Sequence, residues 1–235
     1  MSQETTKGLI VAIDGPSGAG KSTVTRQLAE RLGYVHIDTG AMFRAVALQI
    51  KRSGIDPDDE RAIERLLEQI AISFCRKGGG CRVLINGEDV SAEIRTPEIS
   101  LLSAKIAANR LVREFLLRQQ RAMGKNGGVV LEGRDIGTVV FPEAQVKFFL
   151  SASAEERGRR RFLELQAKGE AVTLERTIAE VVKRDEQDRN REHAPLRRAD
   201  DAIDIDSTTM SVAEVVAQMD GIVREKLAQC NSGQE

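Results

Sequence analysis

A glycine-rich loop near the start of the chain has the residue types and spacing of a phosphate-binding site. Its residues, Gly15-Pro16-Ser17-Gly18-Ala19-Gly20-Lys21-Ser22, match the pattern G-x-x-x-x-G-K-[ST] and are followed by Thr23. The glycines allow successive backbone N–H groups to point inward, and the helix expected next adds the positive end of its dipole. Lys21 would reach the β- and γ-phosphates, and the Ser22 hydroxyl would bind Mg²⁺. The loop therefore predicts a binding site for a nucleoside triphosphate.

Three further polar residues, Asp38, Thr39 and Arg44, follow a short apolar run at residues 34–37. In an open α/β sheet, ligands lie beyond the carboxyl ends of the parallel strands, so we expect these residues at the same edge as the phosphate loop. Considered alone, Asp38 and Thr39 are equally compatible with simple capping of the next helix.

Arginines with helical spacing could neutralise the negative charge that spreads during phosphoryl transfer. Arg157, Arg160 and Arg161 share one face of a predicted helix. They could form a solvated face paired with Glu156 and Glu164. The composition of residues 167–170 is that of a hinge, so we prefer a basic flap that closes over the triphosphate and excludes water.

A second charged face combines Arg184, Asp188 and Arg191 at positions i, i+4 and i+7 of the next predicted helix. From spacing alone, an internally paired surface network and a phosphate-binding cluster are equally compatible with this pattern.

Strands and helices alternate along the chain in the order that would position these residues. Helical patterns, such as that of residues 21–32, follow apolar runs at residues 9–13, 34–37, 129–131, 146–150 and 202–206. Five parallel strands with helices between them predict an α/β protein, a three-layer P-loop fold with a five-stranded parallel sheet. The strand before the glycine-rich loop and the helix after it also disfavour a chance match to the phosphate-loop pattern.

A small antiparallel β insertion interrupts this order. Short alternating runs between residues 72 and 90 are separated by glycines at 78–80 and by Asn86-Gly87, a strong hairpin signal. A helix begins after it at Thr96-Pro97-Glu98. We assign residues 1–70 and 106–235 to the core, with a lid at about 154–170, and residues 71–105 to the insertion.

Composition limits the possible partners. Among 235 residues the formal charge is −1 and Trp is absent, so neither a global charge nor stacking aromatics favour nucleic acid or an anionic membrane. The three cysteines have no metal-ligand spacing; free buried thiols are expected, although a Cys75–Cys81 pair across a hairpin is geometrically conceivable. No apolar run has membrane-spanning length. We expect a soluble, cytoplasmic monomer.

The motifs leave several functions open. No D-x-x-G or N-K-x-D pattern supports a GTPase switch. A kinase for a small acceptor such as shikimate or a sugar acid, a non-metabolic ATPase acting as a switch or nucleic-acid motor, and a weakly catalytic nucleotide-binding protein remain alternatives. The intact Lys21-Ser22 pair disfavours the last.

Several segments resemble the bacterial cytidylate kinases, a family of nucleoside monophosphate kinases, over nearly the whole chain. The resemblance is carried by residues 13–22, 38–44, 90–96, 133–142, 184–185 and 188–191. It implies transfer of the γ-phosphoryl group of ATP to CMP or dCMP with Mg²⁺, and it implies that the 71–105 insertion binds the nucleoside monophosphate.

The resemblance also implies a role for individual residues. The residues expected to bind the acceptor phosphate are Arg44, Arg134 and Arg191. Asp135 and Arg113 would recognise the cytosine edge, because a carboxylate accepts from the exocyclic amine that uracil lacks and arginine donates to ring acceptors. The residues expected to hold the nucleoside are Thr39, Arg184 and Asp188, and the lid over ATP would contain Arg157, Arg160 and Arg161.

Two positions depart from the family pattern. Ala104 occupies the position where many members have a serine that touches the base amine, and either the adjacent Ser103 substitutes for it or selectivity depends more on Asp135. Gly158 and Arg159 replace variable lid residues, and we expect these changes to be neutral.

Overall fold

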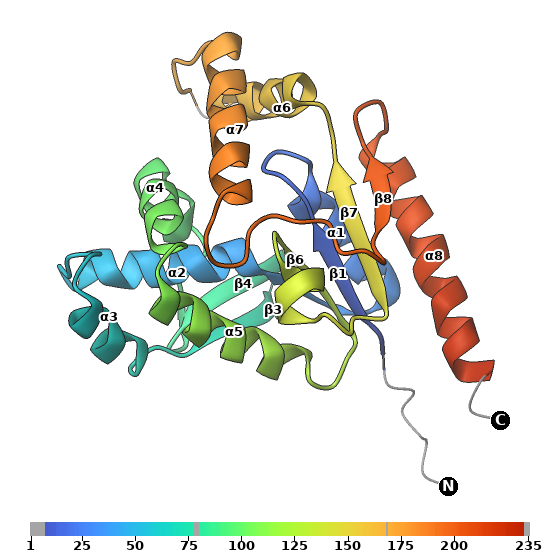
Figure 1. The fold of residues 1–235 in the computed structure, drawn as a ribbon, viewed down its shortest axis with the longest axis horizontal. Helices are drawn as coiled ribbons and strands as arrows, with labels where there is room; N and C mark the ends of the chain where they lie inside the picture. The colour runs from blue at the N-terminus through green and yellow to red at the C-terminus, as the bar shows by residue number, and fades with distance from the viewer. Residues whose placement is uncertain (1–7, 78–79, 168, 233–235) are drawn as a thin grey trace, which may run out of the picture. The chain divides into compact units, whose positions relative to one another are not determined.

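The computed structural model describes residues 8–77, 80–167 and 169–232 of the chain (Figure 1). The chain forms two compact units. Unit 1 combines residues 1–36 with residues 126–235, and unit 2 is Ile37–Lys125.

A parallel sheet forms the centre of unit 1. Its strands are β1 (Ile10–Asp14), β2 (Val35–Asp38), β6 (Val129–Gly133), β7 (Val146–Ser151) and β8 (Ile203–Asp206), in the order β2-β6-β1-β7-β8. The central strand β1 pairs in parallel with β6 and β7, and four of its residues are buried. This burial explains why the strand is a continuous apolar run. The predicted α/β class with a five-stranded parallel sheet is confirmed.

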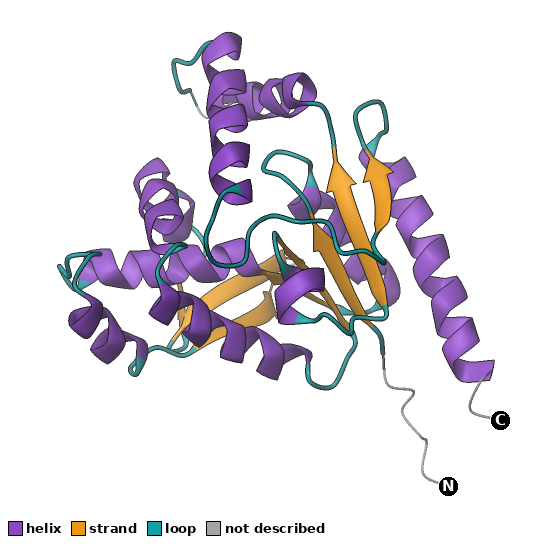
Figure 2. Cartoon of the chain, in the orientation of Figure 1, coloured by secondary structure: helices purple, strands orange, loops and turns teal. Residues whose placement is uncertain are grey.

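Helices α1 (Lys21–Leu32) and α8 (Val212–Ser232) pack against each other and build the core of unit 1 with the sheet (Figure 2). Buried side chains from the two helices, including Leu28 and Met219, contact apolar side chains of β1, β7 and β8. The α8 helix begins with a reciprocal capping box, in which Ser211 and Glu214 each accept from the other's backbone N–H.

Helices α6 (Ala154–Ala167) and α7 (Leu174–Arg189) form a tightly packed pair in unit 1. Gly158 permits this close approach, because a Cβ atom there would lie 2.3 Å from Ile178 Cγ1 and 2.9 Å from Ile178 Cα. Because Gly158 lies where the two helices cross, the expectation that this position is neutral is wrong.

Residue 168, within the predicted hinge, lies outside the described residues.

Unit 2 contains four α-helices and the antiparallel sheet among its described residues. The helices are α2 (Thr39–Arg52), α3 (Glu60–Leu67), α4 (Pro97–Ile106) and α5 (Arg110–Gly124). The sheet consists of β3 (Ile72–Lys77), β4 (Gly80–Ile85) and β5 (Glu88–Asp89), which confirms the predicted antiparallel insertion. Residues 78 and 79 of the predicted glycine turn lie outside the described residues.

Unit 2 is larger than the predicted insertion of residues 71–105. Helix α2 packs against α4 and α5, and Arg52 of α2 donates to the carboxylates of Glu88 and Glu93. These contacts join the insertion to the helices on either side of it in the sequence. Nucleotide binding by the insertion stays a prediction.

The cysteines of the hairpin do not face each other. Cys75 lies opposite Arg82, and Cys81 lies opposite residue 76, so the two cysteines point to opposite faces of the antiparallel pair. All three cysteines are free thiols, as expected, but the expected burial is wrong: Cys75 and Cys81 are half-buried and Cys230 is exposed. Within the described ranges, no helix combines the length and apolar character that crossing a membrane requires.

We expect Gly158→Ala to lower the free energy of unfolding by about 1–2 kcal/mol, because overlap with Ile178 outweighs the gain in helix propensity. Gly221→Ala is the matched control: Gly221 is also helical, but a Cβ atom there meets nothing within 4 Å. It should raise stability by up to about 1 kcal/mol. Denaturant unfolding of both variants tests this, and equal stabilisation of the two would contradict the close approach.

Candidate active site

The phosphate loop of unit 1 depends on glycines at its two ends. Gly15 has a φ of +151°, and a Cβ atom there would lie 2.0 Å from the Leu150 carbonyl oxygen. Gly20 has a φ of +87° and precedes the first residue of α1. A side chain at position 15 would collide with β7, so the close contact between the loop and this strand requires glycine.

Lys21 is buried and its ammonium group donates to two carbonyl oxygens of its own loop, Gly15 O at 2.8 Å and Pro16 O at 2.7 Å. Burial lowers the pKa of Lys21, and the positive charge of Arg134 lowers it further. The nearby carboxylates of Glu132 and Asp14 act in the opposite direction. The ammonium group is therefore held in a desolvated position beside the loop, where an anionic ligand would stabilise its charge.

Ser22 faces a buried carboxylate. Its hydroxyl donates to Glu132 Oε2 at 2.8 Å, and Glu132 Oε1 lies 2.9 Å from His36 Nε2. Glu132 and His36 were not among the residues expected at the site, although a carboxylate near the end of a buried strand is an unusual feature that could have identified Glu132.

This oxygen pair fits Mg²⁺, which binds through one or two protein oxygens and completes its shell with water and substrate phosphates. Among the described residues, no group of three or more His, Cys, Asp or Glu side chains could hold a metal alone. A Mg²⁺ ion at Ser22 and Glu132 would therefore depend on the bound nucleotide.

Asp188 organises two of the arginines expected to bind the acceptor phosphate. Its carboxylate accepts from Arg134 Nε at 2.7 Å and also from Arg191 Nη2. Asp188 is only 1% exposed. Burial raises its pKa, but the positive charges of Arg134 and Arg191, with a smaller effect of Arg184, outweigh burial and lower it. Internal pairing of this cluster is thus present, and its binding to substrate stays a prediction.

Arg157 lies in a different environment from the exposed flap that its spacing suggested. It is 4% exposed, and it donates to Ser17 O of the phosphate loop at 2.9 Å and to Asp185 of α7 at 2.6 Å. Arg161, by contrast, pairs at 2.9 Å with Glu164 in an exposed position, as the solvated-face alternative expected. Arg157 therefore holds the phosphate loop through the Ser17 carbonyl oxygen.

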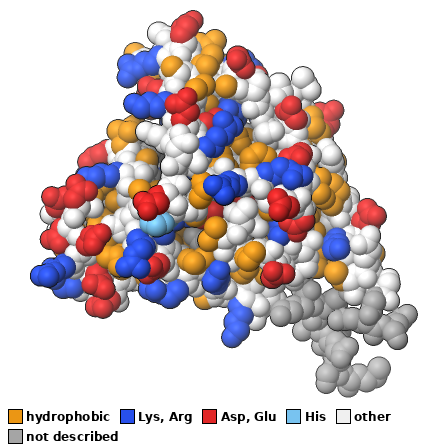
Figure 3. Space-filling view, viewed as in Figure 1, with side chains coloured by type: hydrophobic (Ala, Val, Ile, Leu, Met, Phe, Trp, Pro, Cys, Tyr) orange, Lys and Arg blue, Asp and Glu red, His pale blue; other side chains and the backbone are white. Residues whose placement is uncertain are grey.

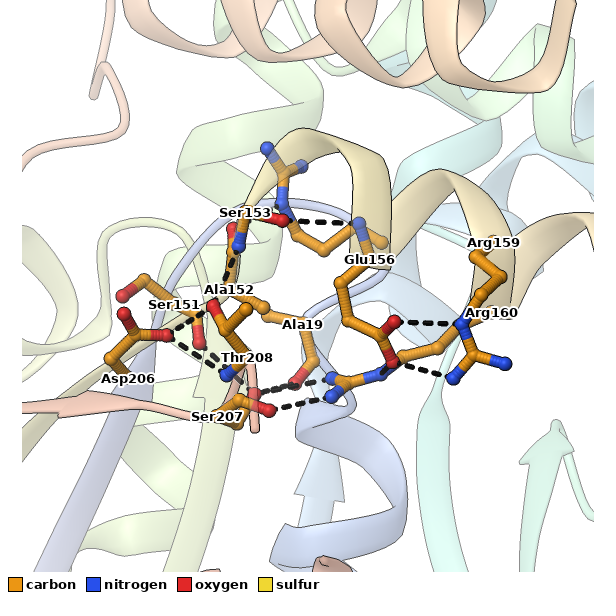
Figure 4. Close-up of polar contacts among 11 residues, drawn as sticks. Ala19, Ser151, Ala152, Ser153, Glu156, Arg159, Arg160, Asp206, Ser207 and Thr208 are labelled. Atoms are coloured by element: carbon orange, nitrogen blue, oxygen red, sulfur yellow. Dashed lines mark hydrogen bonds and ion pairs between the residues drawn. The ribbon is translucent and has the colours of Figure 1, made fainter. Parts of the chain in front are cut away.

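Arg160 reaches the strand ends beside the phosphate loop (Figure 4). It donates to Glu156 at 2.9 Å, to Ser207 Oγ at 3.1 Å and to Ser207 O at 2.6 Å. The buried Ser207 hydroxyl lies within 3.4 Å of Ala19 O and 3.0 Å of Ser151 O. Hydrogen bonds from Arg159 and Arg160 lower the pKa of Glu156 to about 2, so it holds both arginines as an anion. Ser207 was missed because nothing local to residue 207 marks it.

In unit 2, Asp38 both caps α2 and holds an arginine. One of its oxygens accepts from Ala41 N at 2.8 Å, and the other accepts from Arg44 at 3.1 Å. Thr39 begins the helix and is buried. Capping by Asp38, one of the two alternatives for this residue, is therefore present, and the binding roles of Thr39 and Arg44 stay predictions.

Arg113 in α5 stacks over the ring of Phe43, with its guanidinium carbon 5.7 Å from the ring centroid, and donates to Ala107 O at 3.2 Å. Ser103 is buried and its hydroxyl donates to Ser100 O at 2.9 Å, whereas Ala104 is exposed. Compensation of Ala104 by Ser103 stays a prediction.

Known proteins resemble this chain over most of its length. The family model described as cytidylate kinase matches residues 11–225. The chain belongs to the cytidylate kinase family. This confirms the resemblance seen in the sequence.

The curated relatives include a cytidylate kinase of Geobacter sulfurreducens, 64% identical over 226 residues that cover 96% of this chain and 97% of the relative. A cytidylate kinase of Caldicellulosiruptor bescii is 48% identical over 213 residues, covering 91% and 94%. A solved shikimate kinase from Bacteroides thetaiotaomicron matches with 11% identity and a TM-score of 0.49, covering 92% of this chain and 98% of that one.

We expect Arg157→Ala to destabilise the fold by about 3–5 kcal/mol, because Asp185 would remain buried as an unpaired carboxylate. Arg161→Ala removes the exposed pair with Glu164 and should change stability by less than about 0.5 kcal/mol. Denaturant unfolding of the two variants compares the roles directly. An Arg157→Ala variant of unchanged stability would contradict the structural role of the pair with Asp185 and leave only the expected lid contact for Arg157.

Proposed function

We propose that the chain transfers the γ-phosphoryl group of ATP to CMP or dCMP, giving ADP and CDP or dCDP. The observation that carries this proposal is the pairing, within unit 1 of a cytidylate kinase family member, of a phosphate loop with two arginines held by one buried carboxylate. The loop supplies the chemistry for a donor triphosphate, and the arginines supply it for an acceptor phosphate.

ATP is the proposed donor. The backbone N–H groups of residues 15–23 and the amino-terminal end of α1 would bind its phosphates, and Lys21 would neutralise charge that develops during transfer. Ser22 and Glu132 would hold Mg²⁺, which supplies a positive charge shared between the phosphate oxygens. The proposed lid contacts to ATP are Arg157, Arg160 and Arg161, and closing of the lid would prevent water from becoming the acceptor.

The acceptor is proposed to bind through arginines and polar residues predicted from the sequence. The residues assigned to its phosphate are Arg44, Arg134 and Arg191. The residues assigned to the nucleoside are Thr39, Arg184 and Asp188. No general base is needed, because the acceptor phosphate is already anionic at neutral pH. The residues instead overcome repulsion between two anions.

Selection of cytosine is proposed to depend on Asp135 and Arg113. A carboxylate at Asp135 accepts from the exocyclic amine, and Arg113 donates to the ring acceptors. Basic and acidic side chains are interspersed over the face drawn in Figure 3, in keeping with small-molecule substrates rather than a nucleic acid. A monomer suffices for this chemistry.

A coupled ADP-release assay with ATP and Mg²⁺ tests the function. CMP, dCMP, UMP, AMP, GMP and shikimate serve as acceptors, and we expect ADP release with CMP and dCMP. Lys21→Ala should lower turnover by about 100-fold or more with the fold intact, because one charge-stabilising donor is removed. Release without any acceptor, or only with shikimate, would contradict the proposal.

Asp135→Ala tests the source of base selectivity. We expect the ratio of kcat/KM for CMP to that for UMP to fall by about ten-fold or more, since a good base contact discriminates by about 1–3 kcal/mol. The control is Asp204→Ala, which removes an exposed carboxylate of β8 that pairs with Arg198. It should leave the ratio unchanged. An equal loss for both acceptors in Asp135→Ala would mean that Asp135 is structural.

A further inference from the structure

Asp14 is a buried carboxylate at the junction between β1 and the phosphate loop. It is the last residue of β1 and is 4% exposed. Its two oxygens accept from consecutive backbone N–H groups: Oδ1 from Ile136 at 2.8 Å and Oδ2 from Gly137 at 2.7 Å. Both amides belong to the helical turn η2 (Ile136–Val140), which follows β6.

The backbone between β6 and η2 is therefore held at both ends by the same residue. In the parallel ladder Asp14 lies beside Gly133, and its side chain binds the amides of residues 136 and 137. Only Arg134 and Asp135 lie between these two attachments. These are the residues proposed to bind the acceptor phosphate and to recognise cytosine.

A carboxylate is suited to this contact in a way that an amide is not. Two N–H donors require two acceptor oxygens, whereas asparagine offers one oxygen and places an N–H₂ group against the other donor. Space around the contact is also limited. A Cβ atom on Gly137 would lie 3.1 Å from Lys147 Cδ and 3.5 Å from Asp14 Oδ2, and the Lys147 ammonium is held by Asp201 at 2.8 Å.

The charged carboxylate of Asp14 fixes the position of the two amides but does not stabilise the folded chain at neutral pH. Burial raises the pKa of Asp14 to about 6, with a smaller effect of the Asp135 carboxylate, while the two backbone N–H groups and Lys21 oppose the rise. Because the pKa of Asp14 in the folded chain lies above its ordinary value of 3.8, the charged form is disfavoured by folding at neutral pH. This cost disappears as the pH falls from about 6 toward 3.8.

We propose that Asp14 is a positioning residue for the acceptor site: it fixes the backbone that carries Arg134 and Asp135 and thereby sets the discrimination between CMP and UMP. This inference rests on the proposed function. It also connects the strand that leads into the ATP-binding loop with the segment that would select the acceptor.

Asp14→Asn tests the inference, with Asp204→Asn on β8 as the matched control. One hydrogen bond is lost but a buried charge is removed as well, so we expect the variant to fold. The ratio of kcat/KM for CMP to that for UMP should fall by about ten-fold, while KM for ATP changes by less than about two-fold. The Asp204→Asn control should retain both values.

A second measurement does not depend on activity. In the unsubstituted chain, the amide proton signals of Ile136 and Gly137 should shift with pH with a midpoint of about 6, because their acceptor titrates. In Asp14→Asn this titration should be absent. A titration that persists in the variant would assign the shift to another group, such as Asp135, and would overturn the contact.

The outcomes separate the inference from the proposed function. An unsubstituted chain that does not phosphorylate CMP overturns the proposed function and this inference with it. An active chain whose CMP-to-UMP ratio is unchanged in Asp14→Asn overturns the inference alone. If Asp14→Asn does not fold, Gly137→Ala decides, because it displaces the same amide while leaving Asp14 in place: a lowered ratio supports the inference, and an unchanged ratio overturns it.

Discussion

The structure of unit 1 depends on cationic and hydroxyl donors that bind the carbonyl oxygens of the phosphate loop. Lys21 donates to Gly15 O and Pro16 O, and Arg157 donates to Ser17 O. Ser207 lies beside Ala19 O. In a tight loop the carbonyl and N–H of one peptide point in opposite directions, so fixing the carbonyls on the outside orients the N–H groups toward the inside. Phosphate binding by the backbone N–H groups, as proposed, would thus depend on side chains such as Arg157 and Ser207 that bind the carbonyl side of the loop.

The same contacts connect the donor side of unit 1 to its acceptor side. Arg157 joins the phosphate loop to Asp185, and Asp188 follows three residues later on α7 and holds Arg134. Asp14 provides a second connection, from β1 to the turn after Asp135. Because each connection ends in a buried carboxylate with short hydrogen bonds, a displacement on one side would leave charges unpaired on the other. The geometry of the two proposed substrate sites is therefore specified jointly.

Local patterns were sufficient to predict most of the fold but not the environment of individual charged residues. The phosphate loop, the buried strands and the Asn86-Gly87 hairpin follow from short-range rules, and the structure contains all three. Spacing placed Arg157, Arg160 and Arg161 on one face, yet their environments differ. Arg157 binds Asp185 of α7, Arg160 binds Ser207 after β8, and Arg161 pairs within its own helix, and the first two partners are distant in the sequence. A carboxylate in a buried strand marks Glu132 as unusual, but its partner Ser22 is far away in the sequence, and no local signal marks Ser207.

Pairing of the arginines with carboxylates has a consequence for substrate binding. Two unpaired guanidinium groups would attract a phosphate strongly, but they would repel each other and move independently. A buried Asp188 between Arg134 and Arg191 lowers their net charge to +1 and fixes their separation. If the acceptor binds here as proposed, the loss of electrostatic attraction is offset because the two arginines lose less side-chain entropy. Such an arrangement favours a phosphate of one defined orientation over anions in general, and orientation is what transfer between two phosphates requires.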